Sequence, residues 1–293
     1  MKLTLSRAAL AAAAVAFVVI VLGAYVRLSH AGLGCPDWPG CYGELTWPAE
    51  SHEIERANQA FPERPVETAK AWKEMVHRYL AGILVLLVVF INYLAWKPGS
   101  GSRQSRATAG FLLVLILFQA ALGMWTVTLK LKPLIVMAHL LGGLATFSLL
   151  LWLGWRSRPV PAGHDNLSYA PFRSAVLAGL LVLVVQLALG GWTSANYSAL
   201  ACPDFPTCQG QWWPDTNFKD GFVLWREIGV DYEGGVLDLP SRVAIHMAHR
   251  IGAVVTFIVL GALSLALLAR TRTRAGGALL GGLLCAQVTL GIL

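Results

Sequence analysis

Long uninterrupted runs of apolar residues dominate this chain of 293 residues. They show neither the two-residue alternation of a half-buried strand nor the spacing of a surface helix. A run of about 18 apolar residues or more can cross the bilayer core as a helix. Six full runs cover about 8–28, 76–96, 108–129, 133–155, 174–193 and 243–269, and a seventh begins near 276. The pattern therefore predicts an all-α integral membrane protein.

The bulk composition agrees, because 56% of the residues are hydrophobic and only 13% are charged, against about 25% charged in soluble domains. The formal net charge of +7 would suit a nucleic-acid partner, but eleven of the 23 basic residues lie in the N-terminal segment and in short links between apolar runs. They are Lys2, Arg7, Lys97, Arg103, Arg106, Arg156, Arg158, Arg173, Arg270, Arg272 and Arg274. Membrane topology therefore explains the charge, and no nucleic-acid partner is expected.

The same basic residues predict the orientation of the chain, because short cytoplasmic loops are enriched in Lys and Arg. The N-terminus then lies in the cytoplasm and the two long loops, 29–74 and 194–242, face outward. Lys130 and Lys132, in one short outward link, go against the rule. A cleaved signal peptide over Met1–Ala24 is disfavoured, because its apolar run is long for one and because it takes part in the repeat described next.

Three motifs occur twice and in the same order. Cys-Pro-Asp-Trp-Pro-Gly-Cys at 35–41 returns as Cys-Pro-Asp-Phe-Pro-Thr-Cys at 202–208. Met-Val-His-Arg at 75–78 returns as Met-Ala-His-Arg at 247–250, and the Gln-x-x-Leu-Gly element that starts at Gln119 returns at Gln287. The offsets of 167, 172 and 168 residues are nearly constant. Such a collinear repeat indicates duplication of a structural unit.

The duplication predicts two tandem halves, residues 1–160 and 161–293, each built on the plan of a four-helix bundle. Both halves start on the cytoplasmic side, which makes this a parallel repeat. In the first half His139 comes sixteen residues after Gly123, whereas only two residues follow Gly291 in the second. The eighth helix is therefore missing from this sequence, and we expect it to follow in a longer chain.

The Gln-x-x-Leu-Gly element also occurs in the fifth apolar run, from Gln186 to Gly190. Its polar and small residues share one helix face. A glycine there permits close approach of another helix or of a flat ligand, and both interpretations stay open. Trp125 and Trp192, just after the element, fit anchors at the membrane interface.

Three histidines lie near the outer ends of apolar runs: His77, His139 and His249. An ionisable residue in a membrane is costly and usually faces the interior of the helix bundle. Two imidazoles at one depth on neighbouring helices can bind the iron of a haem from both faces. A lone histidine at a helix end can equally be interfacial, but recurrence in register favours ligation. Three others are expected on the surface of polar loops: His30, His52 and His164.

The halves differ at one position beside the repeated histidines. Glu74 lies three residues before His77, and His246 lies three residues before His249, so each is one turn away on the same helix face. A carboxylate beside a porphyrin can act as a base or stabilise positive charge. A solvated acid at a helix start is the simpler alternative. His246 is a candidate haem contact in the second half. Because an imidazole stabilises positive charge less well than a carboxylate, the half that carries Glu74 is predicted to be the reactive one.

Arg78 and Arg250 directly follow the two repeated histidines. A guanidinium suits carboxylates, so each residue is a candidate partner for a haem propionate. The alternative is an interfacial cation that reaches towards water. Both interpretations are kept for both residues.

Four of the five cysteines form two pairs in the long outward loops, Cys35 with Cys41 and Cys202 with Cys208. Disulfides are the expected state in an oxidising compartment such as the periplasm. A structural role is favoured, but a redox-active pair stays open because exposed bridges are more easily reduced. Cys285 lies alone in an apolar run and is expected to be packed.

These motifs closely resemble those of the haem A synthases, the bacterial relatives of a mitochondrial cytochrome oxidase assembly protein. The resemblance rests on Gly-Ala-Tyr-Val-Arg-Leu at 23–28, the segment 30–41, Glu-Met-Val-His-Arg at 74–78 and Met-Ala-His at 137–139. It covers nearly the whole chain, and cysteine pairs in both outer loops match one bacterial subgroup. It implies a multi-pass protein of the bacterial inner membrane, with its large loops in the periplasm.

The resemblance also implies an oxidoreductase that acts on a CH group. Such enzymes oxidise the C8 methyl group of haem O to a formyl group, with oxygen from water, and so provide haem A for cytochrome oxidase. On this basis the first half would bind the substrate through His77 and His139, with Glu74 catalytic. The second half would hold haem b through His249 and a histidine beyond this sequence. The haem O-producing farnesyltransferase and cytochrome oxidase assembly proteins are the implied protein partners.

Two other functions remain open. A b-type cytochrome that only carries electrons would explain the paired histidines but would give Glu74 no task. A membrane thiol oxidoreductase would instead use the cysteine pairs of the outer loops. Replacement of Glu74, or of Cys35 and Cys41, distinguishes these functions from methyl oxidation.

Overall fold

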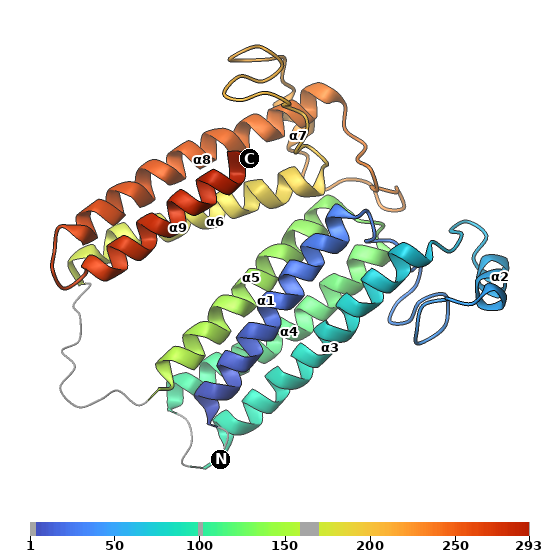
Figure 1. Cartoon of the computed structure of the whole chain (residues 1–293), viewed down its shortest axis with the longest axis horizontal. Coiled ribbons are helices and arrows are strands. Elements are labelled where there is room, and N and C mark those ends of the chain that lie inside the picture. Colours follow the sequence, from blue (N-terminus) through green and yellow to red (C-terminus); the bar gives the residue numbers. More distant parts are fainter. Residues whose placement is uncertain (1–3, 99–101, 159–169, 293) are drawn as a thin grey trace. The chain divides into compact units, whose positions relative to one another are not determined.

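The computed structural model describes residues 4–98, 102–158 and 170–292, and the regular structure in these ranges is helical apart from two isolated β-bridges (Figure 1). The elements are α1 (Leu5–Leu28), α2 (Ser51–Ala60), α3 (Thr68–Trp96), α4 (Arg103–Thr128), α5 (Pro133–Arg156), η1 (Ala170–Phe172), α6 (Arg173–Ala195), α7 (Phe218–Gly221), α8 (Leu239–Leu268) and α9 (Arg274–Ile292). Within the described residues, seven helices are long and apolar enough to cross a membrane: α1, α3, α4, α5, α6, α8 and α9. The prediction of an all-α integral membrane protein is therefore confirmed.

The chain divides into two compact units. The first comprises Met1–Pro159 together with Trp225–Gly234, and the second comprises Val160–Leu224 and Gly235–Leu293. A short segment of the second long loop thus belongs to the first unit, which the repeat does not predict. The expected boundary at 160–161, like Lys2 and His164, lies outside the described residues.

The first unit is a four-helix bundle in which α1 and α4 each pack against both α3 and α5. Alanines of α1, among them Ala9, Ala12 and Ala16, are at most 2% exposed and recur every three or four residues. This stripe of small side chains brings the helix axes close together. At one crossing the Ser6 hydroxyl donates to the Gly154 carbonyl over 2.7 Å, and a Cβ on Gly154 would lie 2.7 Å from Leu10.

The second unit is built around α8, which packs against both α6 and α9. Gly277 of α9 approaches α8 so closely that the Ser264 hydroxyl donates to its carbonyl over 2.8 Å. Among the described helices, α9 contacts α8 alone, so its other faces are open. Cys285 lies on such a face and is exposed, and the expectation that it is packed is therefore wrong.

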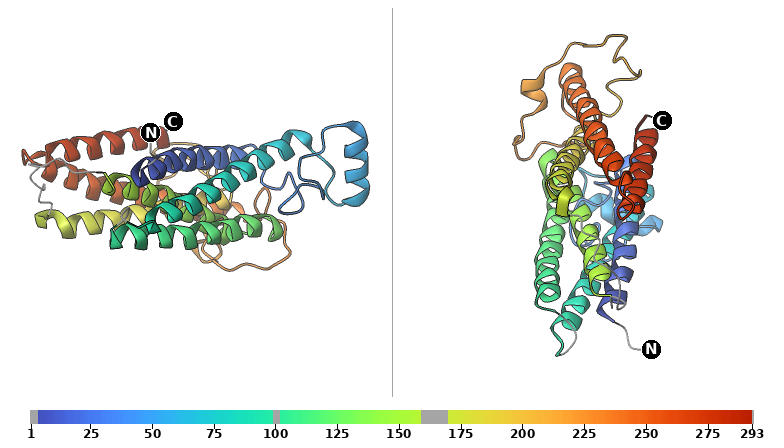
Figure 2. Two further views of the ribbon diagram at one scale, coloured as in Figure 1. Left: turned by 90° about the horizontal axis from the view of Figure 1, so that it is seen from below. Right: turned by 90° about the vertical axis from the view of Figure 1, so that its left-hand side faces the viewer.

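The long loop of the first unit covers one end of its bundle, where α1 and α4 end and α3 and α5 begin (Figure 2). His30 and His52 are exposed there, as predicted. In the second unit, Trp192 is only 2% exposed and its Nε1 donates to the Gly221 carbonyl over 2.9 Å. It is packed under α7, so the expectation of an interfacial anchor is wrong for this residue.

Candidate functional site

The two cysteine loops fold in the same way in the two units. Cys35 is bonded to Cys41, and Cys202 to Cys208. The Asp37 carboxylate accepts from the amide nitrogens of the two residues after Cys41, at 2.6 and 2.8 Å. Asp204 accepts from the equivalent amides after Cys208, at 2.5 and 3.1 Å. An aspartate at the third position of the motif therefore closes the turn in each loop.

In the second loop, hydrogen bonds also stabilise the negative charge of the Asp204 carboxylate. The Thr207 hydroxyl donates to the Asp204 carboxylate, and together with the Gly210 and Gln209 amides it holds the pKa of that carboxyl below its usual range. In the first loop, burial raises the pKa of the Tyr42 phenol, whose hydroxyl donates to the Pro65 carbonyl over 3.3 Å. Both loops are therefore ordered by polar contacts as well as by their disulfides.

The repeated arginines hold these loops against the helix ends. Arg78 Nη1 donates to the carbonyl of Asp37 at 2.9 Å and to that of Gly40. Arg250 donates to the carbonyls of Asp204 and Thr207, at 2.7 and 2.8 Å. The haem contact proposed for these arginines stays a prediction, since both guanidinium groups are engaged in anchoring a loop.

Glu74 is enclosed beneath the first loop and is only 5% exposed. Its Oε1 accepts from Arg78 Nη2 at 2.5 Å, and its Oε2 accepts from the Cys35 amide at 2.9 Å. The alternative of a solvated helix start is therefore wrong for this residue. At the equivalent place in the second unit, His246 is half-buried, with Nδ1 at 3.0 Å from the Ser198 carbonyl oxygen.

His77 lies on α3 and His139 on α5 of the first unit. Each ring rests against a glycine of a neighbouring helix. A Cβ on Gly23 would lie 3.0 Å from Cε1 of His77, and a Cβ on Gly123 would lie 3.5 Å from Cε1 of His139. Among the described residues, neither buried Nδ1 atom has a side-chain hydrogen-bond partner. Two such rings on facing helices fit the axial ligation of an iron porphyrin.

His249 lies at the corresponding place in the second unit, and its ring also rests against a glycine of a neighbouring helix. We call each such place a histidine slot. A Cβ on Gly190 would lie 3.1 Å from its Cε1, almost as Gly23 relates to His77. Its Nδ1, however, lies 3.0 Å from Nε2 of Gln186. The other ring nitrogen remains available, so this residue fits a single axial ligand to a haem iron.

The segment Trp225–Gly234 packs on the loop and helix ends of the first unit. Tyr232 is 3% exposed, and its amide donates to the Lys130 carbonyl over 3.1 Å. Arg64 pairs with Asp231 at 3.2 Å and with Glu233. The Lys132 ammonium, whose residue is 1% exposed, lies 3.4 Å from the ring centroid of Trp225.

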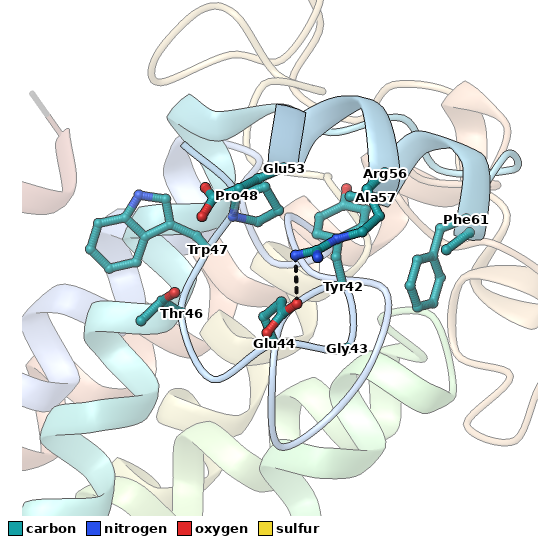
Figure 3. A pocket seen from close by; sticks show the side chains of 11 residues that line it. Tyr42, Gly43, Glu44, Thr46, Trp47, Pro48, Glu53, Arg56, Ala57 and Phe61 are labelled. Carbon is teal, nitrogen blue, oxygen red and sulfur yellow. Dashed lines mark hydrogen bonds and ion pairs between the residues drawn. The ribbon is translucent and has the colours of Figure 1, made fainter. Parts of the chain in front are cut away.

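A cleft of about 350 Å³ lies between the segment 42–48 and α2 (Figure 3). Trp47, Pro48 and Phe61 provide apolar walls, and Arg56 pairs with Glu44 over 2.8 Å across it. It contains none of the predicted haem contacts, so the candidate site is the histidine slot rather than this cleft.

Comparison of the sequence with known proteins assigns the chain to a family. The family model described as "Cytochrome oxidase assembly protein" (COX15-CtaA) matches residues 6–293. The chain belongs to this family. The Heme A synthase of Shewanella oneidensis is 48% identical over 274 residues, which are 94% of this chain and 82% of that relative. The Heme A synthase of Beijerinckia indica is 26% identical over 96% of this chain and 81% of its own length.

Two features of the site were not predicted as such. The repeated Gln-x-x-Leu-Gly element drew attention to Gln186 as a residue of helix packing or ligand contact, whereas its amide lies at the repeated histidine. A polar side chain inside an apolar run was the signal. The docking of Trp225 and Tyr232 on the first unit carried no local signal, because it depends on contacts between residues far apart in the chain.

Proposed function

We propose that this protein is a membrane-bound haem A synthase that oxidises the C8 methyl group of haem O to a formyl group. The observation that carries the proposal is the first unit's pair of glycine-backed histidines with an enclosed carboxylate one turn away. The 48% identity to the Heme A synthase of Shewanella oneidensis over 94% of the chain supports the same function. Further support comes from the family match over residues 6–293.

In this proposal His77 and His139 bind the iron of haem O from its two faces. The macrocycle is then fixed between helices of the first unit, because both rings are seated against glycines. Fixing the substrate removes the entropy cost of orienting it during the reaction.

Glu74 acts on the substrate as a fixed negative charge. Arg78 and the Cys35 amide hold the two carboxylate oxygens in place, so little reorganisation is needed when charge develops. Withdrawal of electrons from the methyl group makes the porphyrin edge positive, and a preorganised carboxylate stabilises that charge. The same group is placed to take a proton from the methyl carbon or from the attacking water, which is the proposed source of the new oxygen.

The second unit, in this proposal, holds haem b through His249. Bound there, haem b would supply one-electron redox chemistry and would pass the four electrons released in converting the methyl group and water to a formyl group, one at a time, to an external electron acceptor. Arg250 and the second disulfide loop order the end of α8 that carries the ligand. His246 fills the place of the reactive carboxylate without its charge, in keeping with an electron-transfer role.

We further place the protein in the bacterial inner membrane, with the N-terminus in the cytoplasm and the disulfide loops in the periplasm. The basic links between helices support this orientation, as do the two disulfides. Haem O would arrive from the farnesyltransferase that produces it, and haem A would pass to cytochrome oxidase assembly proteins.

The direct test is to express the protein in cells that make haem O but not haem A and to separate the extracted haems by chromatography. Haem A is expected with the parent protein and absent from cells without it. The proposal fails if a folded, membrane-inserted protein leaves haem O as the only farnesylated haem.

A further inference from the structure

Gln186 bridges two helices at the histidine of the second unit. From α6 its Nε2 lies 3.0 Å from Nδ1 of His249 on α8, and it donates to the backbone carbonyl of the same residue over 3.1 Å. An amide side chain in a membrane-spanning helix is costly unless it is hydrogen-bonded. Here both contacts go to one histidine, so the ring and its backbone are tied to the neighbouring helix.

Two glycines make this contact possible. A Cβ on Gly252 would lie 2.3 Å from Oε1 of Gln186, and a Cβ on Gly190 would lie 3.1 Å from Cε1 of His249. The Gln186 amide therefore occupies space that a side chain at position 252 would fill. The His249 imidazole likewise occupies space that a side chain at position 190 would fill. Packing on both sides fixes the angle of the imidazole as well as its position.

The first unit has the same slot without the amide. A Cβ on Gly23 would lie 3.0 Å from Cε1 of His77, much as a Cβ on Gly190 would lie 3.1 Å from Cε1 of His249. The residue four positions before Gly23 is Val19, where Gln186 stands four positions before Gly190. Valine has no side-chain hydrogen-bonding group, so Val19 can meet the His77 ring only through its backbone, and no side chain among the described residues bonds to Nδ1 of His77.

We infer that Gln186 is the positioning residue for His249, and that its replacement by Val19 in the first unit leaves His77 free to release its haem. The inference rests on the proposed function. Ligating histidines almost always donate their second ring N–H to an acceptor, which fixes the tautomer and orientation of the ring. A resident haem benefits from such a ligand, whereas a substrate haem has to leave after reaction.

The amide suits either state of the ring. Without iron, Nε2 of Gln186 donates to the Nδ1 lone pair, and the ring carries its proton on the other nitrogen. When that nitrogen binds iron, the proton lies on Nδ1. The Gln186 amide would then turn over so that Oε1, which has no partner among the described residues, accepts this proton, and its hydrogen bond to the His249 carbonyl would be given up.

Gln119 provides a matched control within the chain. It stands four residues before Gly123, just as Gln186 stands before Gly190, and it is buried on α4. Its amide packs against Gly142 and bonds to no described residue. Substitution of Gln119 therefore removes a buried glutamine of the same motif without touching His249.

The test compares Q186L, Q186E and Q119L in the full-length protein, purified with its haem. The readouts are the haem b retained after dilution and the midpoint potential of that haem. Q186L is expected to weaken haem b binding by about ten- to a hundred-fold. Q186E, of unchanged size, is expected to keep the haem at a more negative potential, because a carboxylate makes the ligated ring a stronger electron donor. Q119L is expected to match the parent in both.

Two results would overturn the inference. One is a Q186L protein with parental haem retention and potential; the other is a Q186E protein, folded as the parent, whose potential does not move. Conversion of haem O by the parent protein is scored separately, so loss of that activity tests the proposed function and not this inference. V19Q is expected to slow release of haem A from the first unit, and unchanged release would refute the part concerning His77.

Discussion

The two units place the same parts around a histidine but connect them differently. In the first, Arg78 bonds to a buried carboxylate and the histidine has no side-chain partner. In the second, Arg250 bonds only to loop carbonyls among the described residues and the histidine is held by Gln186. The two units thus share one scaffold and differ at two positions around the histidine. One turn before it stands Glu74 or His246, and on the neighbouring helix stands Val19 or Gln186. In our account these two differences separate a reactive site from a site that retains haem b.

The largest difference between the units is expected in haem A formation, when the residue one helical turn before the histidine, Glu74 or His246, is replaced. E74Q should lower haem A formation by roughly 10²–10⁴-fold, because the amide neither carries charge nor accepts a proton. H246Q should change it by less than about ten-fold, since it removes no charged group from the reactive unit. Haem O conversion in isolated membranes measures both, and retention of haem b serves as the folding control. Equal losses in the two variants would contradict the proposed division of roles.

Loss of the repeated arginines should come next and should act on stability. R78Q leaves the Glu74 carboxylate buried without its partner, which costs about 3–5 kcal/mol. R250Q removes donors from neutral carbonyls only, which costs about 1–3 kcal/mol. Unfolding in mixed detergent micelles measures the difference. The double variant E74Q/R78Q should recover part of the loss, and a double variant less stable than R78Q would argue against an uncompensated charge as the cause.

Removal of the disulfides should have a smaller and more symmetric effect. Each bridge closes a short loop with a sequence separation of 6, so cross-linking contributes about 2 kcal/mol through loop entropy. C35S/C41S and C202S/C208S should therefore destabilise their loops by similar amounts and leave haem O conversion measurable. Abolished conversion in C35S/C41S alone, in a folded protein with its haem, would instead assign a redox task to the first pair.

The smallest effect concerns the segment Trp225–Gly234, which belongs to the first unit. R64A breaks partly exposed ion pairs with Asp231 and Glu233, and such pairs contribute roughly 1 kcal/mol or less. We expect faster proteolysis within the segment and little change in haem A formation. Y232A, which removes a buried ring, is the stronger variant for comparison, and equal protease resistance of both variants and the parent would refute the docking contact.

Much of the fold follows from local pattern, but little of the site does. Unbroken apolar runs predict the membrane-spanning helices, and the collinear motifs predict the likeness of the two cysteine loops. The burial of Glu74 is not predictable in this way, because the first loop covers it only after folding. The partners of Arg78 and Arg250 are backbone carbonyls, which leave no trace in residue type. Cys285 shows the reverse error, since an apolar run predicts a helix but not which of its faces is covered by protein.

The central claim is that the histidines of the two units hold haems of different fate. It is tested most directly by the haem content of two purified variants, H77L/H139L and H249L, each expressed with a source of haem O. The account predicts that H77L/H139L retains haem b and forms no haem A, whereas H249L loses haem b while haem O still binds to the first unit. Haem b lost from H77L/H139L, or haem b kept at the parental level in H249L, would contradict it.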